Sequence, residues 1–134
     1  MIYMVIAGFS LIFSMNMFYT NFCYMGTYRA YLGLYKGAIE VGVITFDNEG
    51  REIVPYFNKL RVVSSVTSYY RLNLKKYVLS YSISYQWTKL TVVFGDEYYR
   101  GVIITLDTSI YGVGEKKFYS SFSIEESGVI VDGQ

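Results

Sequence analysis

The sequence predicts an α+β fold, in which a long N-terminal transmembrane and stalk helix is followed by a second amphipathic helix packed on a small antiparallel sheet of about four strands. Three observations support this class. Residues 1–28 contain no charged side chain, apolar residues repeat with helical spacing after Pro55, and from Tyr77 they alternate with polar residues as in a half-buried strand. We therefore divide the chain into a transmembrane anchor, residues 1–28, and a single α+β domain, residues 29–134, which includes a helical stalk over residues 29–46.

Residues 2–25 are predicted to form the transmembrane helix. A helix needs about 20 mostly apolar residues to cross the hydrocarbon core of a bilayer. Few polar side chains interrupt this run, namely Ser10, Ser14, Asn16, Thr20 and Asn21. A cleaved secretory signal and a buried core helix are the alternatives. The signal fits less well because the run is long, no basic residue precedes it and no small-residue cleavage site ends it, so we expect a retained anchor.

Small residues line one face of the helix where it continues beyond the apolar run. At about 100° per residue, four positions fall in a narrow stripe: Gly26, Ala30, Gly33 and Gly37. Such stripes let another helix approach closely in membranes, so we expect these residues to form a helix-packing interface. The alternative is that the glycines merely loosen the segment, since each costs a helix about 1 kcal/mol.

Tyrosines occupy nearly the opposite face of the same helix. They are Tyr24, Tyr28, Tyr31 and Tyr35. Tyrosine suits both a lipid headgroup belt and the domain's own core, and both locations stay open for this face.

The segment that follows the stalk has two interpretations. Residues 41–46 and 51–54 could form a β-hairpin around a turn at residues 47–50. We favour a helix that continues to about Thr45 and is followed by a turn.

A second helix is predicted from Pro55 to about Lys75, because proline is tolerated in a first helical turn. Its apolar face comprises Tyr56, Val63, Val66, Tyr70, Leu74 and Tyr77. No acidic residue occurs between Glu52 and Asp96, so the other face is basic. A candidate surface for lipid or a partner protein consists of Arg61, Arg71, Lys75 and Lys76. A plain solvated helix face is the alternative.

The remainder of the chain reads as strands. Residues 77–87 alternate most clearly, and residues 90–94, 101–106 and 118–124 are further candidates separated by glycine-containing turns. The short connections predict an antiparallel meander, with the second helix covering its apolar face. Residues 125–134 are expected to be a loosely attached acidic tail, in which residues 129–131 could extend an edge strand.

The composition argues against catalysis and metal binding. The chain has no histidine, which is the commonest general base and metal ligand, and its single cysteine, Cys23, lies in the apolar run. No phosphate-binding loop or dinucleotide-binding glycine pattern occurs. We predict a non-enzymatic protein with no cofactor, no metal and no small-molecule substrate. The net charge of +1 predicts no nucleic-acid partner.

The layout resembles the TadE-like minor pilins of Tad-type (Flp-type) pilus systems and other single-anchor pilin-like proteins. The similarity is one of organisation: an apolar N-terminal helix continues beyond the membrane, and a turn, a helix containing PYFNKL (55–60) and YRLNL (70–74), and a small sheet follow. The resemblance implies a structural subunit that assembles with other pilin-like or membrane-complex subunits through its N-terminal helix. It does not extend to the processing site, because no basic residue precedes Gly8-Phe9 and the fifth position after the cut is Phe13 rather than glutamate.

Two features of the sequence predict opposite orientations in the membrane. Arg29 and Lys36 come after the anchor, which favours a cytoplasmic domain. The pilin resemblance implies an extracytoplasmic domain, and we favour that placement. The alternative function is a single-pass accessory or partner-binding protein of a secretion or conjugation complex, which would use the basic surface of residues 59–76.

Overall fold

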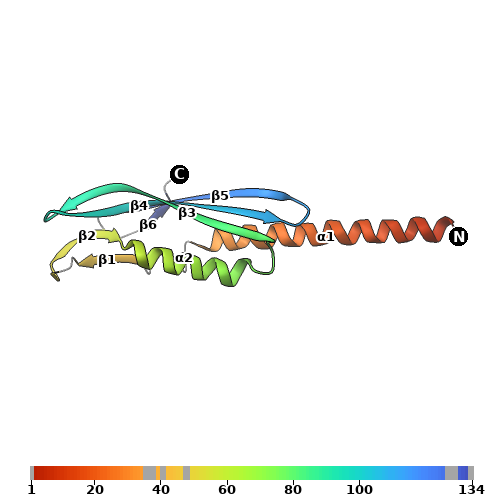
Figure 1. Cartoon of the computed structure of the whole chain (residues 1–134), viewed down its shortest axis with the longest axis horizontal. Coiled ribbons are helices and arrows are strands. Elements are labelled where there is room, and N and C mark those ends of the chain that lie inside the picture. The colour runs from red at the N-terminus through yellow and green to blue at the C-terminus, as the bar shows by residue number, and fades with distance from the viewer. Residues whose placement is uncertain (1, 35–38, 40–41, 47–48, 126–129, 133–134) are drawn as a thin grey trace.

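The computed structural model describes residues 2–34, 39, 42–46, 49–125 and 130–132. It has the predicted α+β class, with a long apolar N-terminal helix, a second helix and an antiparallel sheet. The elements are α1 (Ile2–Leu34), β1 (Val43–Phe46), β2 (Glu52–Phe57), α2 (Lys59–Leu74), β3 (Ser80–Val93), β4 (Asp96–Ile110), β5 (Gly114–Ile124) and β6 (Ile130–Asp132). In Figure 1 the long strands form one layer, α2 and the second half of α1 form the other, and the first half of α1 projects alone from the domain.

Strand β4 lies at the centre of the sheet. It pairs with β3 from Ser80↔Ser109 to Val93↔Asp96 and, on its other edge, with β5 from Gly101↔Ser123 to Ile110↔Gly114. The meander expected for these strands is therefore present. Strand β6 continues the sheet beyond β5, so the end of the described chain forms the edge strand that the sequence left open.

Two hairpin turns fix the length of β4 at its two ends. At the end far from the anchor, Phe94 and Gly95 both have positive φ, 54° and 84°, as in the two-residue turn that matches strand twist. The two strands predicted at residues 77–87 and 90–94 are parts of one long strand, β3, which begins at Ser80 and ends at Val93. Between the two predicted strands, Lys89 has a positive φ of 57°, which is the one positive φ among the described residues of β3.

The predicted stalk helix over residues 29–46 is wrong in its second part. Helix α1 ends at Leu34, and residues 43–46 form strand β1, which pairs with β2 as Val43↔Phe57 and Ile44↔Tyr56. Val43, Ile44 and Phe46 are β-branched or aromatic and favour a strand once a partner strand is present. The hairpin interpretation of this segment is the correct one. Gly37, Tyr35 and the rest of 35–38 lie outside the described residues, as do 40–41 and 47–48.

Helix α2 begins four residues later than predicted. Pro55 lies within β2, and Asn58 caps the helix by accepting a hydrogen bond from the backbone N–H of Arg61 at 3.1 Å. An asparagine at the N-cap satisfies a free amide, which proline at that position could not do. Pro55 falls where the β1–β2 register shifts, so its missing N–H interrupts no regular ladder.

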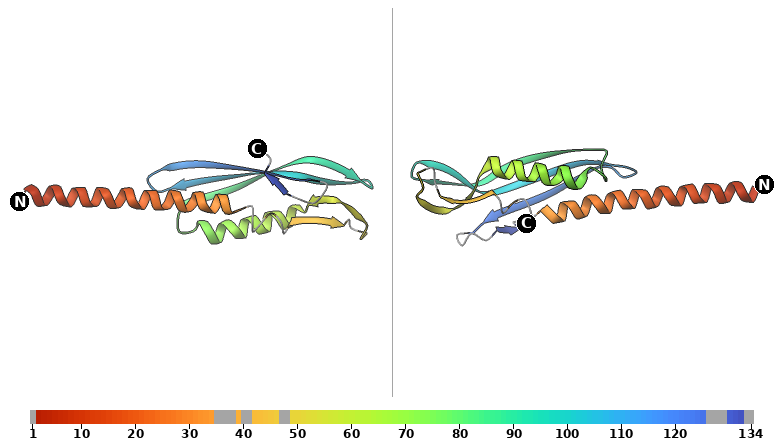
Figure 2. Two further views of the ribbon diagram at one scale, coloured as in Figure 1. Left: turned by 180° about the vertical axis from the view of Figure 1, so that it is seen from behind. Right: turned by 90° about the horizontal axis from the view of Figure 1, so that it is seen from below.

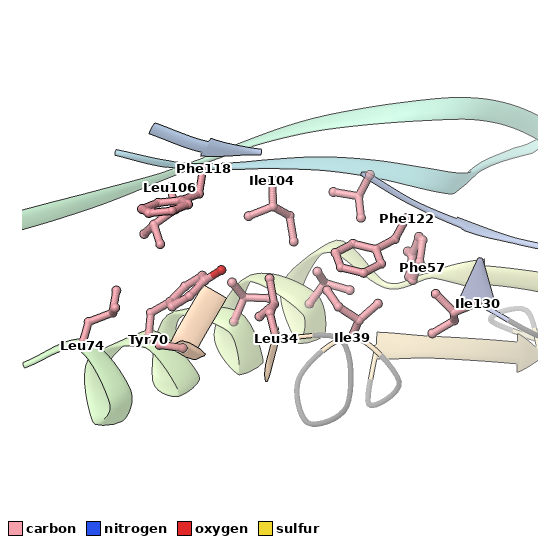
Figure 3. Packing of buried hydrophobic residues seen from close by; sticks show 14 of the residues in the cluster. Leu34, Ile39, Phe57, Tyr70, Leu74, Ile104, Leu106, Phe118, Phe122 and Ile130 are labelled. Atoms are coloured by element: carbon pink, nitrogen blue, oxygen red, sulfur yellow. The ribbon is translucent and has the colours of Figure 1, made fainter. Parts of the chain in front are cut away.

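The hydrophobic core lies between the two layers (Figure 3). Helix α2 contributes one residue per turn, with Val62, Val66, Tyr70 and Leu74 fully buried. They face side chains of the sheet, among them Ile104, Leu106, Phe118 and Phe122. Leu34 and Ile39 complete the same cluster from the end of α1 and the segment after it. The second half of α1 is thus part of the domain core.

Candidate membrane anchor and helix-packing surfaces

The first half of α1 is an exposed apolar rod. Phe9, Phe13 and Phe18 are 70%, 67% and 76% exposed. Within the described part of the chain, α1 is the one helix long and apolar enough to cross a membrane. A continuous apolar surface of this kind marks a lipid or protein contact.

The second half of the same helix is buried in the domain. Cys23, Thr27, Ala30 and Leu34 repeat at intervals of four and three and are almost inaccessible. The buried Thr27 hydroxyl is satisfied because it donates to the carbonyl of Cys23 at 2.8 Å. Because one uninterrupted helix runs through both halves, the exposed rod is joined to the domain without a flexible linker (Figure 2).

The small-residue stripe packs against the chain's own residues. The ring of Tyr77 lies directly against Gly26, and the hydroxyl of Tyr69 lies against Gly33. That hydroxyl donates to the carbonyl of Ala30 at 2.8 Å. The stripe therefore allows the close approach expected of it, but the residues that approach Gly26 and Gly33 come from α2 and the connection after it.

The tyrosine face of α1 packs against β5. The rings of Tyr28 and Tyr31 lie 6.4 Å and 5.0 Å from the ring of Phe118, and the Tyr31 hydroxyl donates to the carbonyl of Tyr119. Tyr24 also packs against the core. Tyr24 and Tyr31 thus pack, partly buried, against the domain core, which is one of the two locations left open by the sequence.

The tip of the β4–β5 hairpin, residues 111–113, touches the middle of α1. Tyr111 donates from its hydroxyl to Oδ1 of Asn16 at 3.0 Å, and its ring lies 5.1 Å from that of Tyr19. Gly112 lies against the side chain of Thr20. A shallow groove of about 390 Å³ runs between the tip and the helix. The sequence marked the glycines as a turn but gave no sign that this turn reaches the apolar helix.

The predicted basic surface is divided along α2. Arg61 lies in its first turn, whereas Arg71 lies in its last turn and Lys75 and Lys76 follow it. Arg61 and Lys75 are fourteen residues apart, which is about 21 Å along a helix. All four side chains are exposed. Lys75 and Lys76 directly precede Tyr77, whose ring contacts Phe22 of α1, whereas Arg61 lies at the other end of α2.

The buried tyrosine hydroxyls remain protonated at neutral pH. Burial raises the pKa of Tyr70 above its ordinary value of 10.0, with smaller effects from Tyr69, Tyr31 and Tyr85. Burial also raises the pKa of Tyr69 and of Tyr85, although a hydrogen bond from Thr67 partly offsets the rise at Tyr85. The Tyr69 hydroxyl donates to the carbonyl of Ala30, whereas the Tyr70 hydroxyl has no hydrogen-bond partner among the described residues.

Three surfaces therefore lie at the anchor end of the domain (Figure 1). They are the apolar half of α1, the uncharged tip of the β4–β5 hairpin, and the cationic end of α2 with its connection to β3. Comparison of the chain with protein-family models, with curated proteins and with solved structures finds no match in any of the three.

Proposed function

We propose that this chain is a non-enzymatic, membrane-anchored structural subunit, pilin-like in its organisation, which assembles through α1 and displays its α+β domain outside the membrane. The observation that carries the proposal is the division of one helix into an exposed apolar half and a buried half. The exposed half needs a cover of lipid or of other apolar helices. Because the other half is buried in the domain, the way in which the anchors of several subunits pack together also sets the relative positions of their domains.

The hairpin tip decides which face of α1 a second copy can reach. Asn16 and Thr20 contact Tyr111 and Gly112. At about 100° per residue, the face turned away from them carries Met4, Leu11 and Phe18, with Met15 at its edge. These positions recur at intervals of seven, four and three, which is the spacing of a helix-packing seam. We assign the contact between subunits to this seam, since Gly26 and Gly33 are already covered within the chain.

Cysteine crosslinking in native membranes tests the assembly. The chain supplies its own control, because its only cysteine, Cys23, is 1% exposed. Met15→Cys and Phe18→Cys should give disulfide-linked dimers on oxidation, whereas Asn16→Cys and Thr20→Cys, on the hairpin side, should stay monomeric. Absence of dimers at all four positions would refute assembly through α1. Equal dimer yields at all four would refute the assigned seam.

Protease treatment of intact cells tests the placement of the domain. A C-terminal tag should be lost if the domain lies outside the membrane, and its protection would place the domain in the cytoplasm. Protection would favour the alternative, an accessory protein that binds a partner through the basic surface. The division of Arg61 from Arg71 along α2 argues against one continuous surface of that kind.

A further inference from the structure

Two parts of the domain contact α1 in the second half of its apolar run. The β4–β5 hairpin tip contacts the helix at Asn16, Tyr19 and Thr20. The ring of Tyr77 contacts it about one turn later, 5.3 Å from the ring of Phe22. Both contacts precede Arg29, the first charged residue of the chain. The domain therefore begins beside a stretch of helix that carries no charge.

The apolar surface of α1 continues past the level of the hairpin tip. Phe18, Phe22 and Met25 are 76%, 48% and 39% exposed, and they lie on the side of the helix turned away from the tip. If lipid covers them, the bilayer surface reaches about Met25. Thr20, which touches the tip, is five residues earlier, or about 7.5 Å deeper along the helix. The interfacial layer of a bilayer is about 5–8 Å thick on each side, so the tip lies within that layer.

The chemistry of this end of the domain suits the same layer. Residues 108–114 contain no charge, and charged residues resume at Glu115. Tyr111 and Val113 are 39% and 40% exposed at the tip. Leu79 is 71% exposed beside the base of the hairpin, where its N–H donates to the carbonyl of Ser109 at 2.8 Å. Tyrosine with exposed aliphatic side chains is typical of the membrane interface.

Cationic side chains flank the apolar ones. Lys75 and Lys76 are exposed in the connection between α2 and β3, next to Tyr77. Among the described residues they take part in no ion pair that would neutralise them. Lysines close to a membrane surface are attracted to the phosphate groups of anionic lipids.

We propose that this end of the domain is a second membrane contact. The tip of the β4–β5 hairpin and Leu79 rest in the interfacial layer, and Lys75 and Lys76 bind anionic lipid headgroups above it. The inference rests on membrane insertion of α1. The contact fixes the height and tilt of the domain on the bilayer, because the tip is fastened to α1 through Tyr111 and Gly112.

Depth-dependent fluorescence quenching tests the contact on the full-length chain. In a Cys23→Ala background, single cysteines at Phe9, Phe94 and Val113 carry an environment-sensitive fluorophore. Each protein is reconstituted in vesicles of phosphatidylcholine and phosphatidylglycerol that contain lipids with a quencher near the headgroup. Phe94 is the matched control, because it lies at the tip of the hairpin at the other end of β4 and is 62% exposed.

The fluorophore at Val113 should be quenched by the lipid-bound quencher and shielded from aqueous iodide, whereas the one at Phe94 should behave in the opposite way. The fluorophore at Phe9 should be shielded from iodide. Iodide quenching at Val113 equal to that at Phe94, with Phe9 still shielded, would overturn the second contact and leave the anchor intact. Iodide quenching at Phe9 would overturn the anchor as well.

A single charge reversal tests the role of the lysines. Quenching at Val113 should increase with the fraction of phosphatidylglycerol, and Lys76→Glu should reduce that increase. Arg61→Glu is the matched control, since it changes the same amount of charge at the far end of α2. An equal response to phosphatidylglycerol in the two variants would show that the lysines do not contact the headgroups.

Discussion

Replacing Gly33 with alanine should change the stability of the domain in opposite directions, depending on whether residue 69 carries a hydroxyl. The added Cβ would clash with the Tyr69 hydroxyl oxygen, while the ring atom that carries it, Cζ, lies at an ordinary contact distance of 3.6 Å. The clash therefore involves one atom, and Tyr69→Phe removes that atom and leaves the ring.

The expected magnitudes follow from three contributions. Alanine in place of a helical glycine stabilises by at most about 1 kcal/mol. Displacing Tyr69 loses its hydrogen bond to Ala30, which contributes about 1 kcal/mol, and overpacking costs a further 1–3 kcal/mol or so. Gly33→Ala should thus destabilise the natural chain by about 1–3 kcal/mol and stabilise the Tyr69→Phe variant by up to about 1 kcal/mol.

Denaturant unfolding of the detergent-solubilised chain measures both effects. Trp87 is the only tryptophan and packs partly buried against the core, so its fluorescence reports the domain rather than the anchor. If Gly33→Ala shifts the free energy of unfolding by the same amount in both backgrounds, within about 0.5 kcal/mol, the hydroxyl of Tyr69 does not lie over Gly33.

Two further predictions concern the hairpin tip and the core. Gly112 has a φ of +75° and touches Thr20, whereas Gly95 has a φ of +84° and open space around it. Backbone strain should lower the free energy of unfolding of Gly112→Ala and of Gly95→Ala by about 1–2 kcal/mol each. Gly112→Ala should lose more than Gly95→Ala, because its added Cβ also clashes with Thr20. The same unfolding assay measures both. The Tyr70 hydroxyl has no hydrogen-bond partner among the described residues, so Tyr70→Phe should stabilise by about 1 kcal/mol at neutral pH. Burial raises the pKa of Tyr70, so its phenol stays protonated in the folded state at a pH where it already ionises in the unfolded state, above a pKa of about 10. This ionisation favours the unfolded state, so the free energy of unfolding falls as the pH rises. The fall between about pH 8 and pH 11 should be smaller in Tyr70→Phe, which has no such group.

Local periodicity was sufficient to predict those elements that carry one unambiguous pattern. The alternation of Tyr81, Ile83 and Tyr85 with serines predicts the half-buried strand, and the charge-free run before Arg29 predicts the apolar helix. Residues 41–46 fit both periods, because a short apolar segment can be a helix turn or a strand. Its pairing with β2 decides between them, and no local pattern contains that information.

The site could be predicted only as far as residue type allows. The stripe of Gly26, Ala30 and Gly33 indicates that something approaches α1 closely, but its spacing cannot distinguish a second subunit from the chain's own tyrosines. The contact of Tyr111 with Asn16 joins residues 95 positions apart. Such a contact depends on the length of β4 and on the direction in which α1 leaves the core, which are properties of the assembled fold.

The internal use of the glycine stripe has a consequence for assembly. A domain on a flexible linker takes no fixed orientation from its anchor. Here Tyr69 and Tyr77 fix the rotation of α1 about its axis, and the hairpin tip holds the helix from another side at Asn16 and Thr20. A second copy packed along Met15 and Phe18 would therefore set the angle between the two domains as well as the distance between the two helices. A small change in the anchor seam would be expressed as a change in how the domains are displayed, even where no residue of the domain touches its neighbour.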